Sequence, residues 1–206
     1  MGEHTETNLR APRRRSFFWN GIRRQWLTHF QFHVIPCLNP YGYVHNTRPN
    51  RKGADINWAF LRDDVAEIGV IRKFVEGRRF EAVIDLYEDW ESPGYYLYEQ
   101  VRGRSPIGRE VTRKDSDVCS LNLSTKIENE EAKDGVIFHD LEAEKRWKGE
   151  GIPIALFQRR IIDHMITSET PTAESTERRI QAHLIAVETI IRAHCIRGET
   201  VEGTRT

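Results

Sequence analysis

The chain has 206 residues, 38% hydrophobic and 30% charged, which fits a single soluble globular domain with a substantial core. Its 31 basic residues balance 31 acidic ones, so net charge gives no general attraction to nucleic acid or to an anionic membrane. Three widely spaced cysteines indicate a reducing compartment, and no apolar stretch reaches the length of a membrane helix or resembles a secretory signal. These features predict a cytoplasmic protein.

The first quarter of the chain is predicted to lead from a polar tail into the domain. Residues 1–15 are basic and lack periodicity, which predicts a disordered tail. Residues 16–29 carry apolar side chains at roughly helical spacing and predict a short amphipathic helix. The apolar run Phe32–Leu38 predicts a strand, with Cys37 as a buried, inert thiol. Residues 41–61 are expected to form a long functional loop.

Helices and strands are predicted to alternate through the rest of the chain. The apolar residues of Asp63–Phe80 recur every three or four positions, which indicates a helix. A last helix is expected to begin at Thr170-Pro171 and to reach about Cys195, because Ile180, Leu184, Val187 and Ile191 follow helical spacing. The other predicted elements are strands over Glu81–Leu86, Gly94–Val101 and Met165–Ser168, and helices near 104–114 and 139–148.

This alternation predicts an α/β fold with a mostly parallel or mixed sheet flanked by helices. The domain is expected to span 16–197 and to be followed by a polar tail over 198–206. In such sheets, functional sites lie beyond the carboxyl ends of strands. The loops after Leu38, Leu86 and Ser168 are therefore the expected positions of a site.

The segment from Asn39 to Phe60 carries the most specific motif. It reads Asn39-Pro40-Tyr41-Gly42-Tyr43, then Arg48, then Gly53-x-Asp55-x-Asn57-Trp58-x-Phe60. On its own, this pattern describes turns held by side chain to backbone hydrogen bonds, with Arg48 as a surface charge. The segment also resembles the Asn-Pro-x-Gly-Tyr, Arg and Gly-x-Asp-x-Asn-Arg-x-Phe pattern of zinc carboxypeptidases, including their succinylglutamate desuccinylase and aspartoacylase branch.

The resemblance implies roles for four residues. Arg48 matches the arginine that stabilises the oxyanion, and Glu169 matches the general base. Asn57 matches one residue of the pair that binds the substrate carboxylate. Trp58 replaces the arginine of that pair, and an indole cannot form a bidentate bond to a carboxylate. Without the resemblance, Glu169 is interpreted as a carboxylate at a helix start.

The family's zinc ligands are not found at the matching positions. Tyr87 stands where the family has its second zinc-binding histidine, and no His-x-x-Glu pair precedes Asn39. The remaining histidines do not follow a known metal-binding spacing. We therefore expect the family's cofactor, zinc, not to be bound, and no metal ligands are assigned.

Three functions remain open from the sequence. The first is an inactive, N-terminally shortened relative that binds a small molecule or peptide. The second is an active zinc-dependent carboxypeptidase or deacylase whose first ligand motif lies outside this sequence. The third is an interaction protein that uses the basic cluster Arg10, Arg13, Arg14 and Arg15. Neither nucleic acid nor membrane is expected as a partner, whereas a sheet lacking its first strands would expose an edge and favour oligomers.

Overall fold

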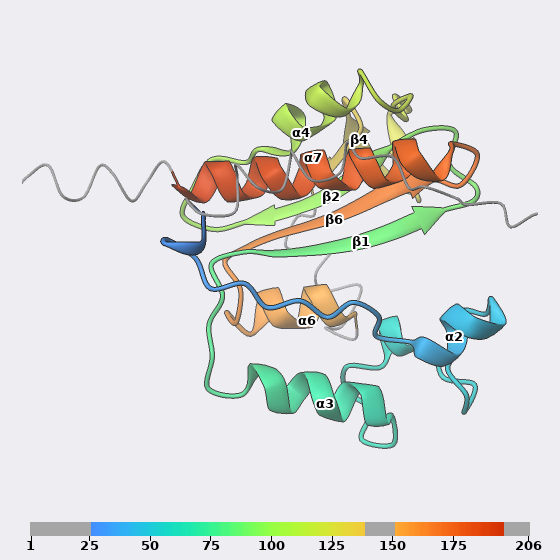
Figure 1. The fold of residues 1–206 in the computed structure, drawn as a ribbon, viewed down its shortest axis with the longest axis vertical. Coiled ribbons are helices and arrows are strands. Elements are labelled where there is room, and N and C mark those ends of the chain that lie inside the picture. Colours follow the sequence, from blue (N-terminus) through green and yellow to red (C-terminus); the bar gives the residue numbers. More distant parts are fainter. Residues whose placement is uncertain (1–25, 139–150, 196–206) are drawn as a thin grey trace, which may run out of the picture.

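The fold is built on one mixed six-stranded sheet with helices on both faces (Figure 1). The computed structural model describes residues 26–138 and 151–195. Within these residues the strand order is β1-β6-β2-β5-β4-β3. The strands are β1 (Val83–Asp89), β2 (Tyr96–Val101), β3 (Lys126–Ile127), β4 (Glu130–Lys133), β5 (Val136–Phe138) and β6 (His164–Pro171).

Strand direction changes across the middle of the sheet. β1 and β6 run parallel, β2 runs antiparallel to β6, and β5 runs parallel to β2. β4 is antiparallel to both of its neighbours. The predicted α/β class with a mixed sheet is therefore confirmed, and the carboxyl ends of β1 and β6 lie beside the amino end of β2.

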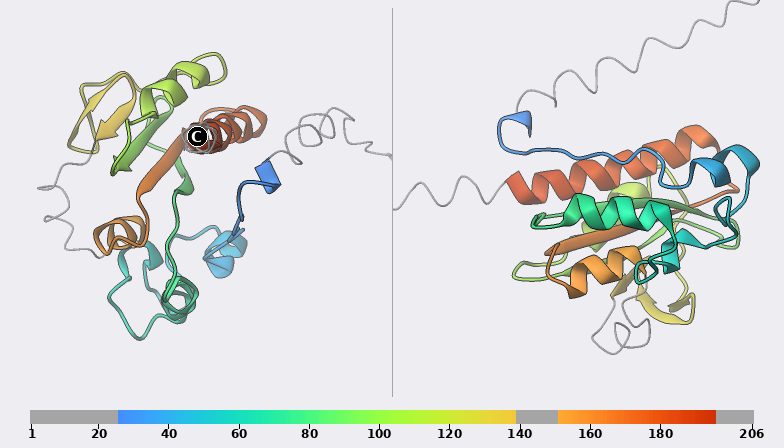
Figure 2. Two further views of the ribbon diagram at one scale, coloured as in Figure 1. Left: turned by 90° about the vertical axis from the view of Figure 1, so that its left-hand side faces the viewer. Right: turned by 90° about the horizontal axis from the view of Figure 1, so that it is seen from below.

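The helices form two layers, one on each side of the sheet (Figure 2). α4 and α7 cover one face, and α3 and α6 lie on the other (Figure 1). In the described part of the chain, no helix is long and apolar enough to cross a membrane. The helical elements are α2 (Pro40–His45), the 3₁₀ helix η1 (Ile56–Trp58), α3 (Ala66–Val75), α4 (Gly108–Asp115), α6 (Ile152–Gln158) and α7 (Thr176–Cys195).

Each face of the sheet has its own apolar core. On the α3 and α6 side, Ile68 and Phe157 pack with Met165 of β6. On the α4 and α7 side, Val111 and Ala186 pack with Ile166, the next residue of β6. Because neighbouring residues of a strand point to opposite faces, β6 contributes to both cores and is fixed on both sides.

α7 confirms the predicted last helix, but its buried face differs from the apolar stripe in the sequence. Ala182, Ala186 and Ile190 recur every four residues and are buried against the sheet, whereas Ile180 is 44% exposed. Small alanine side chains let the helix approach the strands closely. The sequence pattern located the helix without showing which residues face the core.

Several sequence predictions are wrong. Phe32–Leu38 forms no strand, and Cys37 is exposed rather than buried. Thr170 and Pro171 are the last residues of β6, and α7 begins only at Thr176. The expected loop over 41–61 contains most of α2 and all of η1. The predictions for 1–15, 139–148 and 198–206 lie outside the described residues, as does most of 16–29.

The failed strand and the extended β6 have physical reasons. In the described chain, Phe32–Leu38 pairs with no strand, so its apolar residues gain no sheet hydrogen bonds. β6 can continue into Pro171 because this residue lies opposite Asp89 at the end of β1, where the missing N–H of proline costs little. The backbone N–H of Thr172 then donates to the carbonyl of Asp89 at 3.0 Å.

Candidate functional site

The centre of the candidate site is one row of residues across three adjacent strands. Glu169 of β6 is paired with Tyr87 of β1 on one side and with Tyr96 of β2 on the other. Directly paired residues point to the same face, and neighbouring strands lie about 4.8 Å apart. The carboxyl group of Glu169 therefore projects between two phenol rings, on the sheet face that carries α3 and α6. We call these three residues the site row.

The surroundings of Glu169 favour its protonated form. Burial, followed by the negative charges of Glu128, Asp89 and Asp85, raises the pKa of Glu169 from 4.5 to about 8. The positive charge of Arg48 acts in the opposite direction. A carboxyl group that titrates near neutral pH can accept and release a proton under physiological conditions. The structure thus gives Glu169 a property of an acid–base residue.

Tyr87 is held as a neutral phenol. Its Oη donates to Oδ1 of Asn57 at 3.1 Å. Burial, together with the charges of Asp85 and Glu169, raises the pKa of Tyr87 above its ordinary value. A phenol must lose its proton to become a strong metal ligand, and this environment opposes that loss.

The Asn39 motif builds the loop that carries Arg48. Asn39 caps α2, because its Oδ1 accepts from the backbone N–H of Gly42 at 2.9 Å. Pro40 occupies the first helical position, where its missing N–H is not needed. Nδ2 of Asn39 donates to the carbonyl of Arg48 at 2.9 Å. One asparagine therefore connects the start of α2 to the backbone of Arg48.

Arg48 and Asn57 are placed by the same carboxylate. Nε of Arg48 donates to Oδ2 of Asp55 at 2.7 Å, and Oδ1 of Asp55 accepts from the backbone N–H of Asn57 at 3.1 Å. The hydrogen bond to Asp55 is the main reason that the pKa of Arg48 is raised. Arg48 remains 65% exposed and stays charged, so it supplies a fixed cation at the edge of the site.

A buried asparagine anchors this loop to α3. Oδ1 of Asn50 accepts from the backbone N–H groups of Lys52 and Ala54, at 3.0 and 2.9 Å. Its Nδ2 donates to both carboxylate oxygens of Glu67 in α3. Asn50 is only 5% exposed, so these hydrogen bonds form away from competing water. They fix the loop that places Asp55 and Asn57.

Trp58 lies on η1 with its ring toward the start of α6. A Cβ atom built on Gly151 would lie 3.2 Å from Cζ3 of Trp58, so the ring packs closely over this glycine. Trp58 thus supplies an apolar contact between η1 and α6. Binding of substrate by Trp58 stays a prediction.

Four further residues of the site were not predicted from the sequence. Tyr96 and Tyr98 of β2 have rings 5.8 Å apart and both donate to Glu128, at 3.4 and 2.8 Å. Tyr96 also donates to Asp89 at 3.0 Å. Glu128 lies at the tip of the β3–β4 hairpin, 41 positions before Glu169 in the sequence. Neither a motif nor a spacing connects Glu128 to the site.

The residues around Glu169 do not fit a zinc ion. They are carboxylates and phenols, whereas zinc in proteins is held mainly by histidine and cysteine. In residues 26–138 and 151–195, no group of three His, Cys, Asp or Glu side chains is arranged to hold a metal ion. His164 and His183 point to the opposite face of the sheet. Whether the chain binds zinc stays a prediction.

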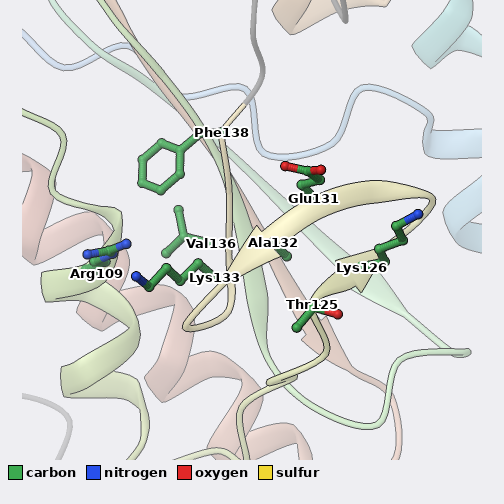
Figure 3. Close-up of a pocket in the computed structure, with 8 residues that line it drawn as sticks. All are labelled: Arg109, Thr125, Lys126, Glu131, Ala132, Lys133, Val136 and Phe138. Atoms are coloured by element: carbon green, nitrogen blue, oxygen red, sulfur yellow. The ribbon is translucent and has the colours of Figure 1, made fainter.

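A hollow lies apart from this site, on the sheet face that carries α4 (Figure 3). It has a volume of about 550 Å³ and contains none of the predicted site residues. In Figure 3, Arg109 and Lys133 lie near each other below the ring of Phe138. The lining residues are Arg109, Thr125, Lys126, Glu131, Ala132, Lys133, Val136 and Phe138.

Comparisons by sequence and by structure give different results. No protein-family model matches the chain, and no curated protein sequence matches it. Three solved structures, each of a candidate metallopeptidase, do share its fold. The match to the protein of Shewanella denitrificans OS217 has a TM-score of 0.68 and 22% identity, and covers 86% of this chain and 66% of the other.

The other two structures lead to the same result. The protein of Shewanella baltica OS155 matches with a TM-score of 0.62 and 18% identity, over 77% of this chain and 61% of the other. For the protein of Shewanella amazonensis SB2B, the TM-score is 0.64 and the identity 19%, over 82% and 69% of the two chains. The chain therefore has a metallopeptidase-like fold, and it spans 66% of the length of the first of these proteins.

Proposed function

We propose that this chain is a ligand-binding relative of zinc carboxypeptidases that does not carry out metal-dependent hydrolysis. The observation that supports this most directly is the site row, in which a neutral Tyr87 stands beside Glu169. This row lies at the carboxyl end of two parallel strands, a position where α/β folds commonly bind ligands, and this supports the proposal. The proposed ligand is a peptide or another small molecule.

The chemistry of amide hydrolysis supports a binding function. Zinc lowers the pKa of bound water to about 7, whereas free water has a pKa of about 15.7. Glu169, with a pKa of about 8, would have to activate free water without that help. Arg48 can stabilise negative charge on an oxyanion, but it cannot make water a better nucleophile.

The charges of the site favour a ligand with a positive group. Glu128 and Asp89 accept hydrogen bonds from the tyrosines beside Glu169, whereas Arg48 is already paired with Asp55. An ammonium group can bond to the carboxylates and lie over the tyrosine rings. Recognition of a carboxylate would need the arginine that Trp58 replaces. The proposed ligand is therefore a peptide amine or another small cation.

Two matched probes test this function. Phenylalanine amide carries a positive amine, and N-acetylphenylalanine carries a carboxylate on a similar body. We expect phenylalanine amide to change the NMR signals of Tyr87 and Glu169 at millimolar concentration, and the Glu128→Gln variant, which removes a carboxylate charge, to bind it at least about threefold more weakly. Glu131→Gln, an exposed residue of β4, serves as the control. Stronger binding of N-acetylphenylalanine would overturn the proposed ligand class, and binding of neither probe would overturn the function.

An active zinc-dependent carboxypeptidase or deacylase is the second candidate. It is favoured by one observation: the chain spans only 66% of a metallopeptidase-fold structure, so ligands supplied by a longer chain are compatible with it. Metal analysis and calorimetry with zinc separate the two functions, because an enzyme should bind zinc at micromolar concentration or below. For a longer chain that includes a His-x-x-Glu pair, Tyr87→His should then create or strengthen peptidase activity.

A further inference from the structure

His183 of α7 contacts the two residues that flank Glu169. Its Nδ1 lies 3.0 Å from Oγ of Ser168, and its Nε2 lies 3.3 Å from Oγ1 of Thr170. Ser168 and Thr170 are fully buried on the face of β6 that α7 covers. Glu169 lies between them in the sequence and points to the other face. His183 therefore holds the strand immediately behind the carboxylate of the site.

The same hydrogen bonds extend to the other two strands of the site row. Oγ1 of Thr170 donates to the carbonyl of Tyr87 at 3.3 Å. Ser168 is bonded to the hydroxyl of Tyr95 at 2.8 Å, and Tyr95 directly precedes Tyr96. One histidine is thus linked to the backbone of Tyr87, to both neighbours of Glu169 and to the neighbour of Tyr96.

The direction of the hydrogen bonds on either side of His183 follows from the carbonyl of Tyr87. The carbonyl of Tyr87 can only accept, so Thr170 uses its single proton there and accepts from Nε2 of His183. A neutral imidazole carries one N–H, so a proton on Nε2 leaves Nδ1 to accept from Ser168. Burial, followed by the positive charge of Arg179, lowers the pKa of His183 to about 4, which keeps the ring neutral at neutral pH.

We infer that His183 is a positioning residue, which fixes the three residues of the site row from the opposite face of the sheet. The inference takes from the proposed function only the identity of the site. It adds a fixed orientation: a continuous set of hydrogen bonds sets how Glu169 is aligned between the two tyrosines. A chain of largely buried hydrogen bonds is suited to this task, because breaking one of them leaves a polar group unpaired against the sheet.

A second histidine network on the same face provides a matched control. His194, also in α7, lies 3.0 Å from His164, which is bonded to Glu99 at 2.9 Å. Glu99 in turn accepts from the backbone N–H of Gly108 at the start of α4 at 2.7 Å. This network is more deeply buried than that of His183, and it connects α7 and β6 to α4 and contacts none of the site row. Its loss should lower stability without disturbing the site.

The titration of Glu169 in the folded protein separates positioning from stability alone. We compare full-length wild type, His183→Leu and His194→Leu by carboxyl-carbon NMR and by thermal unfolding. Both variants should unfold at lower temperature. Only His183→Leu should move the pKa of Glu169, by about one unit down from about 8, because a less fixed side chain gains access to water. An unchanged pKa of Glu169 in folded His183→Leu would overturn the inference, as would an equal shift in His194→Leu.

The amide variant His183→Gln gives a second measurement, which can be made even if His183→Leu does not fold. The side chain of His183→Gln can place an N–H where Nε2 lies, and so keeps the bond toward Thr170. In His183→Gln, the pKa of Glu169 should lie between its values in wild type and in His183→Leu. If His183→Leu does not fold, the expected result is a pKa of Glu169 below the wild-type value. Hydrogen exchange should quicken at residues 168–170 and stay unchanged at 164–166; equal quickening along β6 would contradict positioning. Neither readout needs a ligand, so both remain informative if the proposed binding function fails.

Discussion

Gly42 illustrates how little freedom single residues have in the loop that carries Arg48. A Cβ atom at this position would overlap with Nδ2 of Asn39 and with the backbone carbonyl of Thr47. The first of these atoms donates to the carbonyl of Arg48, and the second belongs to the turn that ends α2. A glycine is needed here because of this close approach of side chain and backbone, and the position of Arg48 depends on it.

Replacing Gly42 by alanine should loosen the loop and leave the sheet intact. We expect Gly42→Ala to cost about 2 kcal/mol or more, because the backbone carbonyl cannot move away freely. Hydrogen exchange should quicken over residues 39–50. The control is Gly69→Ala in α3, where no atom lies within 4 Å of the new Cβ. This variant should stabilise the protein by about 0.5–1 kcal/mol, because alanine favours a helix more than glycine does. A loss of stability at Gly69 that equals the loss at Gly42 would contradict the steric explanation.

The β3–β4 hairpin brings a carboxylate into the site from a distant part of the chain. Glu128 and Asn129 form its two-residue turn, with φ of 51° and 66°. Such turns match the natural twist of two antiparallel strands and so hold the hairpin at a defined angle. The carboxylate at the tip then accepts hydrogen bonds from both Tyr96 and Tyr98.

Removing the charge at the hairpin tip should change the acidity of Glu169. After burial, the charge of Glu128 is the strongest cause of the raised pKa of Glu169. Glu128→Gln should therefore lower this pKa from about 8, while the amide can still accept a bond from Tyr98. Carboxyl-carbon NMR measures the change, and Glu130→Gln, two residues further along, is the control. A pKa of Glu169 that does not fall in Glu128→Gln would show that the hairpin lies further from the site in solution.

The elements that could be predicted from the sequence are those whose apolar pattern is strong. α3, α7 and the strands β1, β2 and β6 were located in this way, with ends that differ by several residues. The strands β3 to β5 were missed because each has only two to four residues, and β3 and β4 also carry the charged residues Lys126, Glu130 and Lys133. One available signal was overlooked: Asp134-Gly135, with φ of 56° and 76°, is the turn between β4 and β5.

The candidate site was accessible to sequence reasoning only in part. Arg48, Asn57, Tyr87 and Glu169 belong to segments that resemble a carboxypeptidase motif or that end a predicted strand, and they lie close together in the structure. Glu128 and His183 contact the site from other elements. The strand register brings Glu128 to Tyr96 and Tyr98, and the packing of α7 brings His183 to Ser168 and Thr170. Such relations depend on the whole fold, so no local pattern in the sequence could show them.

Across the whole molecule, buried titratable groups make stability depend on pH in an uncommon direction. Glu169 and the fully buried Asp115 have pKa values of about 8, raised from 4.5 and 3.8 mainly by burial. Between about pH 4 and 8, these two groups therefore keep protons in the folded protein that they have already released in the unfolded chain. Stability falls as pH rises through this range, because rising pH favours the unfolded chain, which has released protons that the folded protein keeps. His183 acts oppositely: its lowered pKa contributes stability that is lost as pH falls from 6.5 to about 4.

The balance of these groups predicts greatest stability in mildly acidic solution. Between pH 4.5 and 6.5, Glu169 and Asp115, together with Asp85, whose pKa burial also raises, outweigh one histidine, and above 6.5 the carboxyl groups act alone. We expect the unfolding temperature at pH 5 to exceed that at pH 8 by about 5–10 °C. Glu169→Gln should remove part of this difference, and Glu169→Gln combined with Asp115→Asn should remove most of it, whereas Glu131→Gln should leave it unchanged. An unfolding temperature that rises from pH 5 to pH 8 in the wild type would mean that these carboxyl groups are ionised in the folded protein, and that the site row is open to water.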